Sequence, residues 1–241
     1  MKLHLILPMA GGGTRFLKGG FECPKPLLEL NGKPFFQWAA ESVLQTLTPE
    51  SLRFVVLKEH VERFQIDRRI RAVYPQAELT VLERVTAGAV LTCLAGCEGL
   101  PEDAAVLFND CDHYFRCDAL ARLDARADGA LLTFRSRDPR FSFVQLDARG
   151  LVLRTAEKEA ISDRAICGAY YFGSVRTFRT AAARYLETCT QSEFFMSGVY
   201  NALLAAHGAV EALETQVHVS FGTPEEYEAA RHDARLEGAE A

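Results

Sequence analysis

The segment LHLILPMAGGGTRF spans residues 3–16 and joins an apolar, β-prone run directly to three glycines. An apolar run of this length, ended by Pro and Gly, predicts a buried strand. Gly11, Gly12 and Gly13 let the backbone pass close to a ligand and turn its N–H groups toward an anion. Arg15 adds a guanidinium suited to phosphate oxygens. This segment therefore predicts a strand that leads into a phosphate-binding loop.

Lys25 follows the loop and stands between Pro24 and Pro26. The prolines restrict the backbone and so preorganise the lysine side chain. The segment matches neither the Walker loop nor the G-x-G-x-x-G dinucleotide pattern. Arg15 and Lys25 are thus candidate catalytic cations of a different phosphate site, and a flexible loop beside a surface lysine is the alternative.

Working outward, β-prone runs alternate with helical periodicity up to residue 138. We predict strands at Leu3–Met9, Leu52–Leu57, Glu78–Leu82, Ala104–Asn109 and Gly129–Ser136. We predict helices at Pro34–Leu47, Glu59–Val73, Ala87–Gly96 and Cys117–Arg126. This order predicts an α/β fold with a Rossmann-like, mostly parallel sheet flanked by helices on both faces.

The pattern becomes mixed after residue 138. We predict a hairpin from Phe141–Leu146 and Val152–Thr155, strands at Ala165–Gly173 and Val210–Val219, and helices at Val175–Glu187 and Val199–His207. We expect one domain over residues 1–241. It comprises a nucleotide-binding core (1–138), an acceptor-binding portion (139–224) and a C-terminal helix and tail (225–241).

Composition excludes several classes of protein. The chain has 241 residues, of which 49% are hydrophobic and 24% are charged, which excludes a disordered, collagen-like or coiled-coil chain. Its net charge of −5 argues against a nucleic-acid partner, which would need a basic face. No run approaches the roughly 20 apolar residues of a membrane-spanning helix, so we expect no membrane partner.

The seven cysteines are odd in number and scattered, which argues against a disulfide framework and favours a reducing, cytoplasmic location. Cys111, His113 and Cys117 are close enough to raise the question of zinc. They lack the usual paired C-x₂-C spacing and an evident fourth ligand, so we do not predict a zinc site.

A pair of carboxylates, Asp110 and Asp112, follows the strand predicted at Ala104–Asn109. Carboxylate oxygens at a strand end suit Mg²⁺, and a triphosphate needs such a cation to offset its charge. We therefore predict Mg²⁺ as the cofactor, with Asp112 as the preferred ligand and Asp110 as the second candidate. The alternative is that these acids cap the following helix.

The sequences LPMAGGGTRF and PKPLLELNGKP, at residues 7–16 and 24–34, resemble the signature of sugar-1-phosphate nucleotidylyltransferases, also called pyrophosphorylases. The resemblance is greatest to members encoded with bacterial capsule or surface-polysaccharide genes. It implies that Arg15 binds the β and γ phosphates and that Lys25 stabilises charge at the α phosphate. It also implies a nucleotide-binding set of Ala10, Gly11, Gly12, Gly13 and Thr14.

The same resemblance places Thr86 and Gly88 against the nucleobase, although an ordinary strand-to-helix turn explains both residues as well. It places Glu157, Lys158 and Gly168 in the acceptor pocket. Glu157 offers a hydroxyl acceptor and Lys158 a phosphate donor, and a solvated charge pair is the alternative.

Two late segments complete the resemblance. Residues 193–201 resemble the part of the family that closes near the acceptor, although their aromatic side chains fit a core equally well. Many family members carry an aspartate shortly before Gly-Thr that completes the metal site, and here Ser220 stands at that place. A neutral serine is a much poorer Mg²⁺ ligand.

These features predict a Mg²⁺-dependent nucleotidyltransferase. It would transfer a nucleoside monophosphate from a nucleoside triphosphate to a phosphorylated small acceptor and release pyrophosphate. The expected acceptor is a sugar 1-phosphate, and the product a precursor of surface polysaccharide. A CTP-dependent enzyme for a non-sugar phosphate is the first alternative, a metal-dependent glycosyltransferase the second, and a binding-only domain the third. The sequence leaves homo-oligomerisation open.

Overall fold

The structure is a computed structural model that describes residues 2–123 and 127–237. Its core is a parallel layer of four neighbouring strands in the order β5 (Glu78–Leu82), β4 (Ser51–Leu57), β1 (Leu3–Pro8) and β6 (Ala105–Asn109). All four lie at strands predicted from the sequence. Because parallel strands end at the same edge of a sheet, the segments that follow β1 and β6 meet there.

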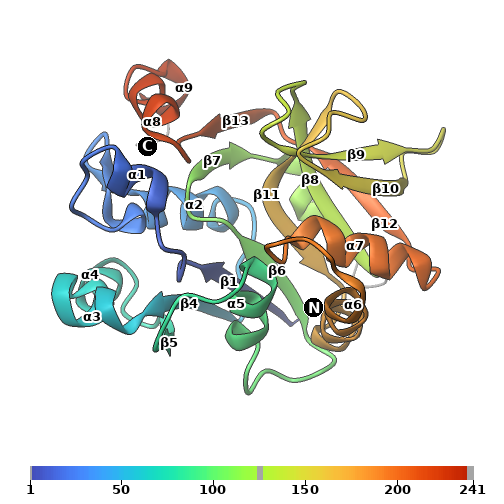
Figure 1. Ribbon diagram of the computed structural model, residues 1–241, viewed down its shortest axis with the longest axis horizontal. Coiled ribbons are helices and arrows are strands. Elements are labelled where there is room, and N and C mark those ends of the chain that lie inside the picture. Colours follow the sequence, from blue (N-terminus) through green and yellow to red (C-terminus); the bar gives the residue numbers. More distant parts are fainter. Residues whose placement is uncertain (1, 124–126, 238–241) are drawn as a thin grey trace.

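The second half of the chain extends this sheet in mixed orientation (Figure 1). β11 (Arg164–Phe172) lies antiparallel to β6 and, on its other side, to β8 (Gly129–Arg135). β12 (Val210–Glu214) runs parallel to β8. The hairpin of β9 (Ser142–Leu146) and β10 (Val152–Glu157) joins the sheet through β11. The predicted α/β fold with a mostly parallel sheet is confirmed.

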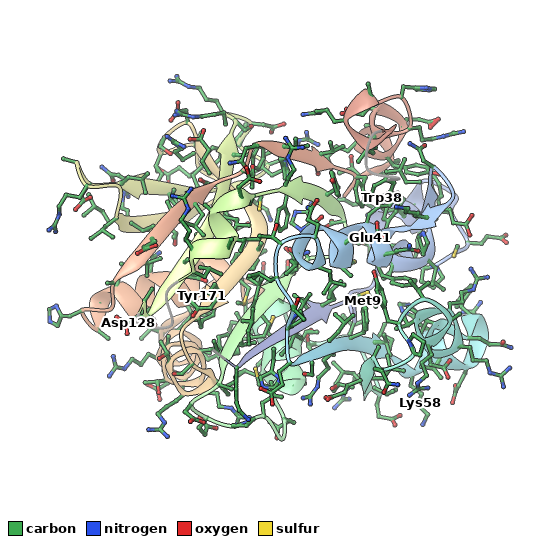
Figure 2. All side chains as sticks on the ribbon, turned by 180° about the vertical axis from the view of Figure 1, so that it is seen from behind. Met9, Trp38, Glu41, Lys58, Asp128 and Tyr171 are labelled. Atoms are coloured by element: carbon green, nitrogen blue, oxygen red, sulfur yellow. The ribbon has the colours of Figure 1, made fainter. Side chains whose placement is uncertain are left out.

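Helices cover both faces of the sheet, as alternation along β1 requires. Leu5 and Leu7 face a core shared with α2 (Phe35–Leu44) and α4 (Ile66–Val73). Ile6 faces the opposite core, shared with α5 (Ala89–Gly96), α6 (Val175–Thr188) and α7 (Met196–Ala205). Tyr171 and Trp38, labelled in Figure 2, are completely buried.

A third apolar cluster joins the C-terminal segment to the start of the chain. β13 (Val217–Ser220) pairs with β7 (His113–Arg116) outside the main sheet, and α8 (Pro224–Ala230) and α9 (Ala234–Glu237) follow. Phe221 packs on Phe35 of α2 and Tyr227 on Phe16 of α1 (Thr14–Lys18). Figure 1 shows α8 and α9 close to α1. The C-terminal segment thereby reaches the edge where β1 and β6 end.

Some predicted elements differ from the structure. A helix at Cys117–Arg126 is wrong for the described residues: Cys117 precedes a short 3-10 helix, Asp118–Arg122, and residues 124–126 lie outside the described residues. The strand predicted at Val210–Val219 is two strands, β12 and β13, which pair with different partners. The second error arises because β13 forms a long-range pair with β7 and not with the main sheet.

The helix predicted at Glu59–Val73 is divided into α3 (Lys58–Phe64) and α4. Gln65 separates them with φ 51°, a left-handed conformation that ends the first helix. Two further short elements follow α1: a 3-10 turn at Lys25–Leu27 and a ribbon of β2 (Glu29–Leu30) with β3 (Lys33–Pro34). No helix in the described ranges is both long and apolar enough to cross a membrane.

Candidate active site

The glycine loop leaves the end of β1 and passes beside Lys25. Met9 continues the strand by donating its N–H to the carbonyl of Val55 at 2.8 Å. Gly13 has φ 58°, which suits glycine, and precedes α1. A Cβ built on Gly13 would lie 3.7 Å from the Cβ of Lys25. The loop and the lysine are therefore in van der Waals proximity.

A cavity of about 740 Å³ opens on this loop. Its walls include Gly11, Gly12, Gly13, Leu17, Lys25 and Val85, and we call it the glycine cavity. Leu17 and Val85 are large apolar side chains that stay 56% and 51% exposed. A cavity with glycine backbone, a cation and apolar walls suits a ligand that has both anionic groups and a flat apolar part.

A second, smaller pocket of about 230 Å³ lies beside it. Four carboxylates line it, those of Asp110, Asp112, Glu157 and Glu226, and we call it the carboxylate pocket. Arg15 and Arg140 also line it. Cations and carboxylates on the walls of one pocket suit an acceptor that carries both phosphate and hydroxyl groups.

Lys25 and Asp112 meet where the two cavities adjoin. Nζ of Lys25 donates to Oδ2 of Asp112 at 2.9 Å, and the side chains are 26% and 27% exposed. Burial lowers the pKa of Lys25, but the charge of Asp112 more than offsets this and raises it. Burial likewise raises the pKa of Asp112, and Lys25 then holds it below its usual range. Both groups are thus charged at neutral pH.

Asp110 is held against the backbone of β11. Gly168 has φ 95° at an irregularity of that strand, and a Cβ built there would lie 2.9 Å from Oδ2 of Asp110. The N–H of Asp110 also donates to the carbonyl of Gly168 at 2.9 Å. Burial, with the charge of Asp112 beside it, raises the pKa of Asp110. Glycine at position 168 therefore leaves room for this carboxylate.

The C-terminal segment supports Asp112 from the other side. Phe221 donates its N–H to the carbonyl of Asp112 at 2.9 Å, and a Cβ built on Gly222 would lie 2.6 Å from Oδ2 of Asp112. Glu226 accepts the hydroxyl of Ser220 at 2.9 Å and the N–H of Gly222 at 3.0 Å. Ser220 thus supports the loop beneath Asp112, through Glu226.

Asp110 and Asp112 are the carboxylates placed to bind Mg²⁺. Within residues 2–123 and 127–237, no three His, Cys, Asp or Glu side chains are grouped so as to hold a metal ion by themselves. Asp110 and Asp112 nevertheless supply hard oxygen donors. Burial and then the charge of Asp112 raise the pKa of Asp110, and a bound cation would offset both effects. Mg²⁺ accepts one or two carboxylates when phosphates and water complete its shell. The residues fit a cation held mainly by its phosphate ligand.

Two neutral histidines adjoin these acids. His113 donates from Nε2 to Oδ1 of Asn109 at 3.0 Å, since the amide of Asn109 itself donates to the carbonyl of Ala39. Burial lowers the pKa of His113 to about 4 and that of His218 to about 3. Both rings line the carboxylate pocket. They add no positive charge to it at neutral pH.

Glu157 and Lys158 have different surroundings. Glu157 lines the carboxylate pocket and accepts the hydroxyls of Ser142 and Ser197 at 2.5 Å and 2.8 Å. Lys158 is exposed and is not one of the residues that line the carboxylate pocket. Its Nζ lies 4.7 Å from the centre of the Phe195 ring. Arg140, which pairs with Glu226 at 3.4 Å, and Arg15 are the cations that line the carboxylate pocket together with Glu157.

The remaining predicted site residues are distributed around the two cavities. Ala10 is buried at the end of β1, and Thr14 is exposed at the start of α1. Thr86 donates its hydroxyl to the carbonyl of Gly88 at 2.9 Å. Val85, the residue before Thr86, lines the glycine cavity, whereas Thr86 and Gly88 are not among its lining residues.

The structure also shows three residues that the sequence did not indicate: Arg140, His218 and Glu226. Each comes from a turn or from the C-terminal segment and reaches the site through the pairing of β7 with β13 or through the β9–β10 hairpin. A local pattern does not reveal such contacts. The Gly-Thr at 222–223, which the resemblance singled out, was the nearest available signal.

Comparisons with known proteins agree with this architecture. A family model described as a MobA-like NTP transferase domain matches residues 5–218. The fold is similar to a nucleoside-diphosphate-sugar pyrophosphorylase from Vibrio cholerae RC9, with 21% identity and a TM-score of 0.83 over 95% of this chain and 100% of that one. It is also similar to the inositol-1-phosphate CTP transferase from T. maritima, with 11% identity and a TM-score of 0.76 over 99% and 94% of the two chains. No curated protein sequence matches significantly.

Proposed function

The chain belongs to the family of MobA-like NTP transferase domains and is a nucleotidyltransferase, and from this premise we propose the reaction that it performs. It transfers the nucleoside monophosphate of a nucleoside triphosphate to the phosphate of a small acceptor, a sugar 1-phosphate, and releases pyrophosphate. The glycine cavity receives the triphosphate, and the carboxylate pocket receives the acceptor.

One observation carries the proposal: the Lys25–Asp112 ion pair lies where the two cavities adjoin. The lysine is a wall of the glycine cavity, and the aspartate is a wall of the carboxylate pocket. A phosphoryl group that displaces this contact would meet the cation of Lys25 on one side and the cation-binding carboxylate of Asp112 on the other. Positioning and charge neutralisation of this kind are what phosphoryl transfer requires of a protein.

In the proposed step, an oxygen of the acceptor phosphate attacks the α phosphorus of the triphosphate. A new bond forms between that oxygen and the α phosphorus. The bond from the α phosphorus to the oxygen it shares with the β phosphorus breaks, and pyrophosphate leaves with the electron pair. No proton transfer is required, because the attacking phosphate is already anionic. Lys25 stabilises the negative charge at the α phosphate. Arg15 lines the carboxylate pocket and not the glycine cavity, so its proposed contact with the β and γ phosphates requires the triphosphate to extend past the Lys25–Asp112 pair.

Asp112, with Asp110 behind it, would hold Mg²⁺ at this site. The ion would supply positive charge to the phosphates and favour their in-line arrangement. The protein's own part is to fix the two carboxylates, through Gly168 for Asp110 and through Phe221 and Gly222 for Asp112. Ser220 stands where the resemblance leads one to expect a further aspartate. The loop that contains Ser220, Phe221 and Gly222 supports Asp112 and adds no metal ligand there.

Glu157 is the proposed acceptor-recognition residue. Two serine hydroxyls fix one of its oxygens, so the carboxylate has a defined orientation in the pocket wall. An oriented carboxylate suits the hydroxyls of a sugar or polyol phosphate. A sugar nucleotide made in this way would serve as an activated precursor of surface polysaccharide. The name of the T. maritima neighbour makes CTP with inositol 1-phosphate the second donor–acceptor pair to examine.

The test is pyrophosphate release in the presence of Mg²⁺. CTP, UTP, dTTP, ATP and GTP are each combined with glucose 1-phosphate, myo-inositol 1-phosphate and phosphocholine. Release that requires one donor together with one acceptor supports the proposal and identifies both substrates. Release of a nucleoside diphosphate from a nucleotide sugar would instead indicate a glycosyltransferase. A triphosphate that raises the Tm without any turnover would indicate a binding protein.

A further inference from the structure

The segment that leads into α5 is bonded to the segment that leads into α7. Phe194 donates its N–H to the carbonyl of Ala87 at 3.1 Å, and Val90 donates its N–H to the carbonyl of Phe194 at 3.3 Å. These two backbone bonds flank Gly88. They join residues that are more than 100 positions apart. They fix the position of the Phe194 backbone relative to the start of α5.

Gly88 makes this approach possible. Its φ of 147° is a conformation that side chains rarely adopt. A Cβ built on Gly88 would lie 2.4 Å from the N and 2.6 Å from the O of Phe194. These atoms belong to the backbone, so no flexible side chain can yield to the added carbon. A residue other than glycine would displace the segment around Phe194.

Tyr185 of α6 holds the same segment from behind. Phe195 donates its N–H to the Tyr185 hydroxyl at 3.2 Å, and that hydroxyl donates to Oε1 of Gln191 at 3.2 Å. The rings of Tyr185 and Phe194 also pack edge to face, with centroids 6.3 Å apart. Residues 194 and 195 are thus fixed between Gly88 on one side and Tyr185 on the other.

The fixed segment is a wall of the carboxylate pocket. Phe195 and Met196 line that pocket, and so does Ala89, the residue after Gly88. Gly88 itself lines neither cavity. We propose that Gly88 is a positioning residue for the acceptor, acting through Phe194, and that it does not read the nucleobase. This inference rests on the proposed function, in which the carboxylate pocket holds the acceptor.

The experiment compares Gly88→Ala with Gly99→Ala. Gly99 also has a positive φ, 76°, but nothing lies within 4 Å of a Cβ built there. Both variants introduce backbone strain, and only Gly88→Ala adds a steric clash with the backbone of Phe194. We expect Gly88→Ala to raise the KM for the acceptor by about tenfold or more, with kcat changed far less. We expect triphosphate affinity, measured by calorimetry without acceptor, to stay within about twofold.

Tyr185→Phe is the second variant, for the case in which Gly88→Ala does not fold. It removes the hydroxyl that accepts from Phe195 and keeps the ring. We expect faster hydrogen exchange at the amides of Phe194 and Phe195, unchanged exchange at Gly11 to Gly13, and an acceptor KM raised about threefold. The KM is measured with whichever of the three acceptors above supports pyrophosphate release.

The outcomes separate this inference from the proposed function. Weaker triphosphate binding in Gly88→Ala, with an unchanged acceptor KM, would overturn the inference and restore a base-reading role. Faster exchange in this segment of Tyr185→Phe with an unchanged acceptor KM would overturn it as well. Triphosphate binding without turnover for any acceptor would contradict the proposed function and, with it, the acceptor role of this wall.

Discussion

The ammonium of Lys25 lies 2.9 Å from a carboxylate oxygen of Asp112, although the two residues are 87 positions apart. Lys25 lines the glycine cavity and Asp112 lines the carboxylate pocket, so the pair lies between the two. In the proposed reaction the α phosphate takes over the contact with Lys25, and Asp112 would then be free to hold Mg²⁺. The ion pair thus keeps both groups charged and in place before the substrates arrive.

Replacing Lys25 by alanine is expected to lower kcat by at least about 100-fold, because it removes a cation aimed at the charge that develops in the transition state. The fold should persist, since the side chain is only half-buried and its partner remains exposed to solvent on one side. Steady-state pyrophosphate release gives the rate, and circular dichroism gives the fold. Normal turnover in a folded Lys25→Ala variant would exclude the proposed role.

Asp112→Asn is expected to abolish Mg²⁺-dependent turnover, with a loss of at least about 100-fold in kcat at saturating Mg²⁺. The amide keeps the size of the side chain but is a poorer cation ligand. Removal of the charge should also lower the pKa of Asp110, because Asp112 raises it. Calorimetric titration of Mg²⁺ into the triphosphate complex checks the affinity. An unchanged Mg²⁺ dependence would exclude Asp112 as a ligand.

Gly168→Ala is expected to displace Asp110, because the new Cβ would lie 2.9 Å from Oδ2. Gly150→Ala is the matched control: Gly150 has φ 85°, close to the 95° of Gly168, and open space around its Cβ position. Both variants should lose about 1 kcal/mol of stability from backbone strain. Turnover should fall by about tenfold or more in Gly168→Ala alone. Equal turnover in the two variants would show that the Asp110 position is not critical.

Glu157→Gln is expected to raise the acceptor KM by about 10- to 100-fold, the value of a hydrogen bond to a charged group. Triphosphate affinity should not change, because Glu157 lies outside the glycine cavity. Glu159→Gln, which alters an exposed carboxylate two residues further on, is the control. If the two variants have the same acceptor KM, Glu157 does not contact the acceptor.

Stability without ligands should depend on pH through His113. Burial lowers the pKa of this ring to about 4, whereas an unfolded histidine has a pKa near 6.5. The unfolded chain therefore binds more protons between these values, so the stabilising contribution is complete above about pH 6.5 and falls as the pH drops toward 4. Between pH 7 and pH 5, the free energy of unfolding should fall by about 2 kcal/mol more in the wild type than in His113→Gln. Urea unfolding at both pH values, with chelator present, measures the difference, and parallel pH curves would contradict it.

Much of the fold could be predicted because its signals are local. β1 and the glycine loop follow from an apolar run that ends in Pro and Gly, and β4, β5 and β6 follow from similar runs. Lys25 and the pair of acids, Asp110 and Asp112, were predicted as separate features. Their contact depends on β6 lying next to β1, which local periodicity does not specify.

The parts that could not be predicted depend on distant pairing or on side-chain direction. β7 and β13 are short and stabilise each other, so neither has a strong signal alone, and Gly222 and Glu226 reach the site through them. The family resemblance implied that Glu157 and Lys158 line one acceptor pocket. Adjacent residues of an extended strand point to opposite sides, and Lys158 has a left-handed φ of 55° beyond the strand end. Its ammonium accordingly lies over the ring of Phe195.

Product analysis distinguishes nucleotidyl transfer to an acceptor phosphate from other reactions of a nucleoside triphosphate. The protein is incubated with Mg²⁺, the active triphosphate and the active acceptor, and the products are identified by ³¹P NMR and mass spectrometry. We expect a diphosphate that joins the nucleoside monophosphate to the acceptor, formed in equal amount with pyrophosphate and lost in Lys25→Ala. Free nucleoside monophosphate with pyrophosphate, or nucleoside diphosphate with inorganic phosphate, would contradict it.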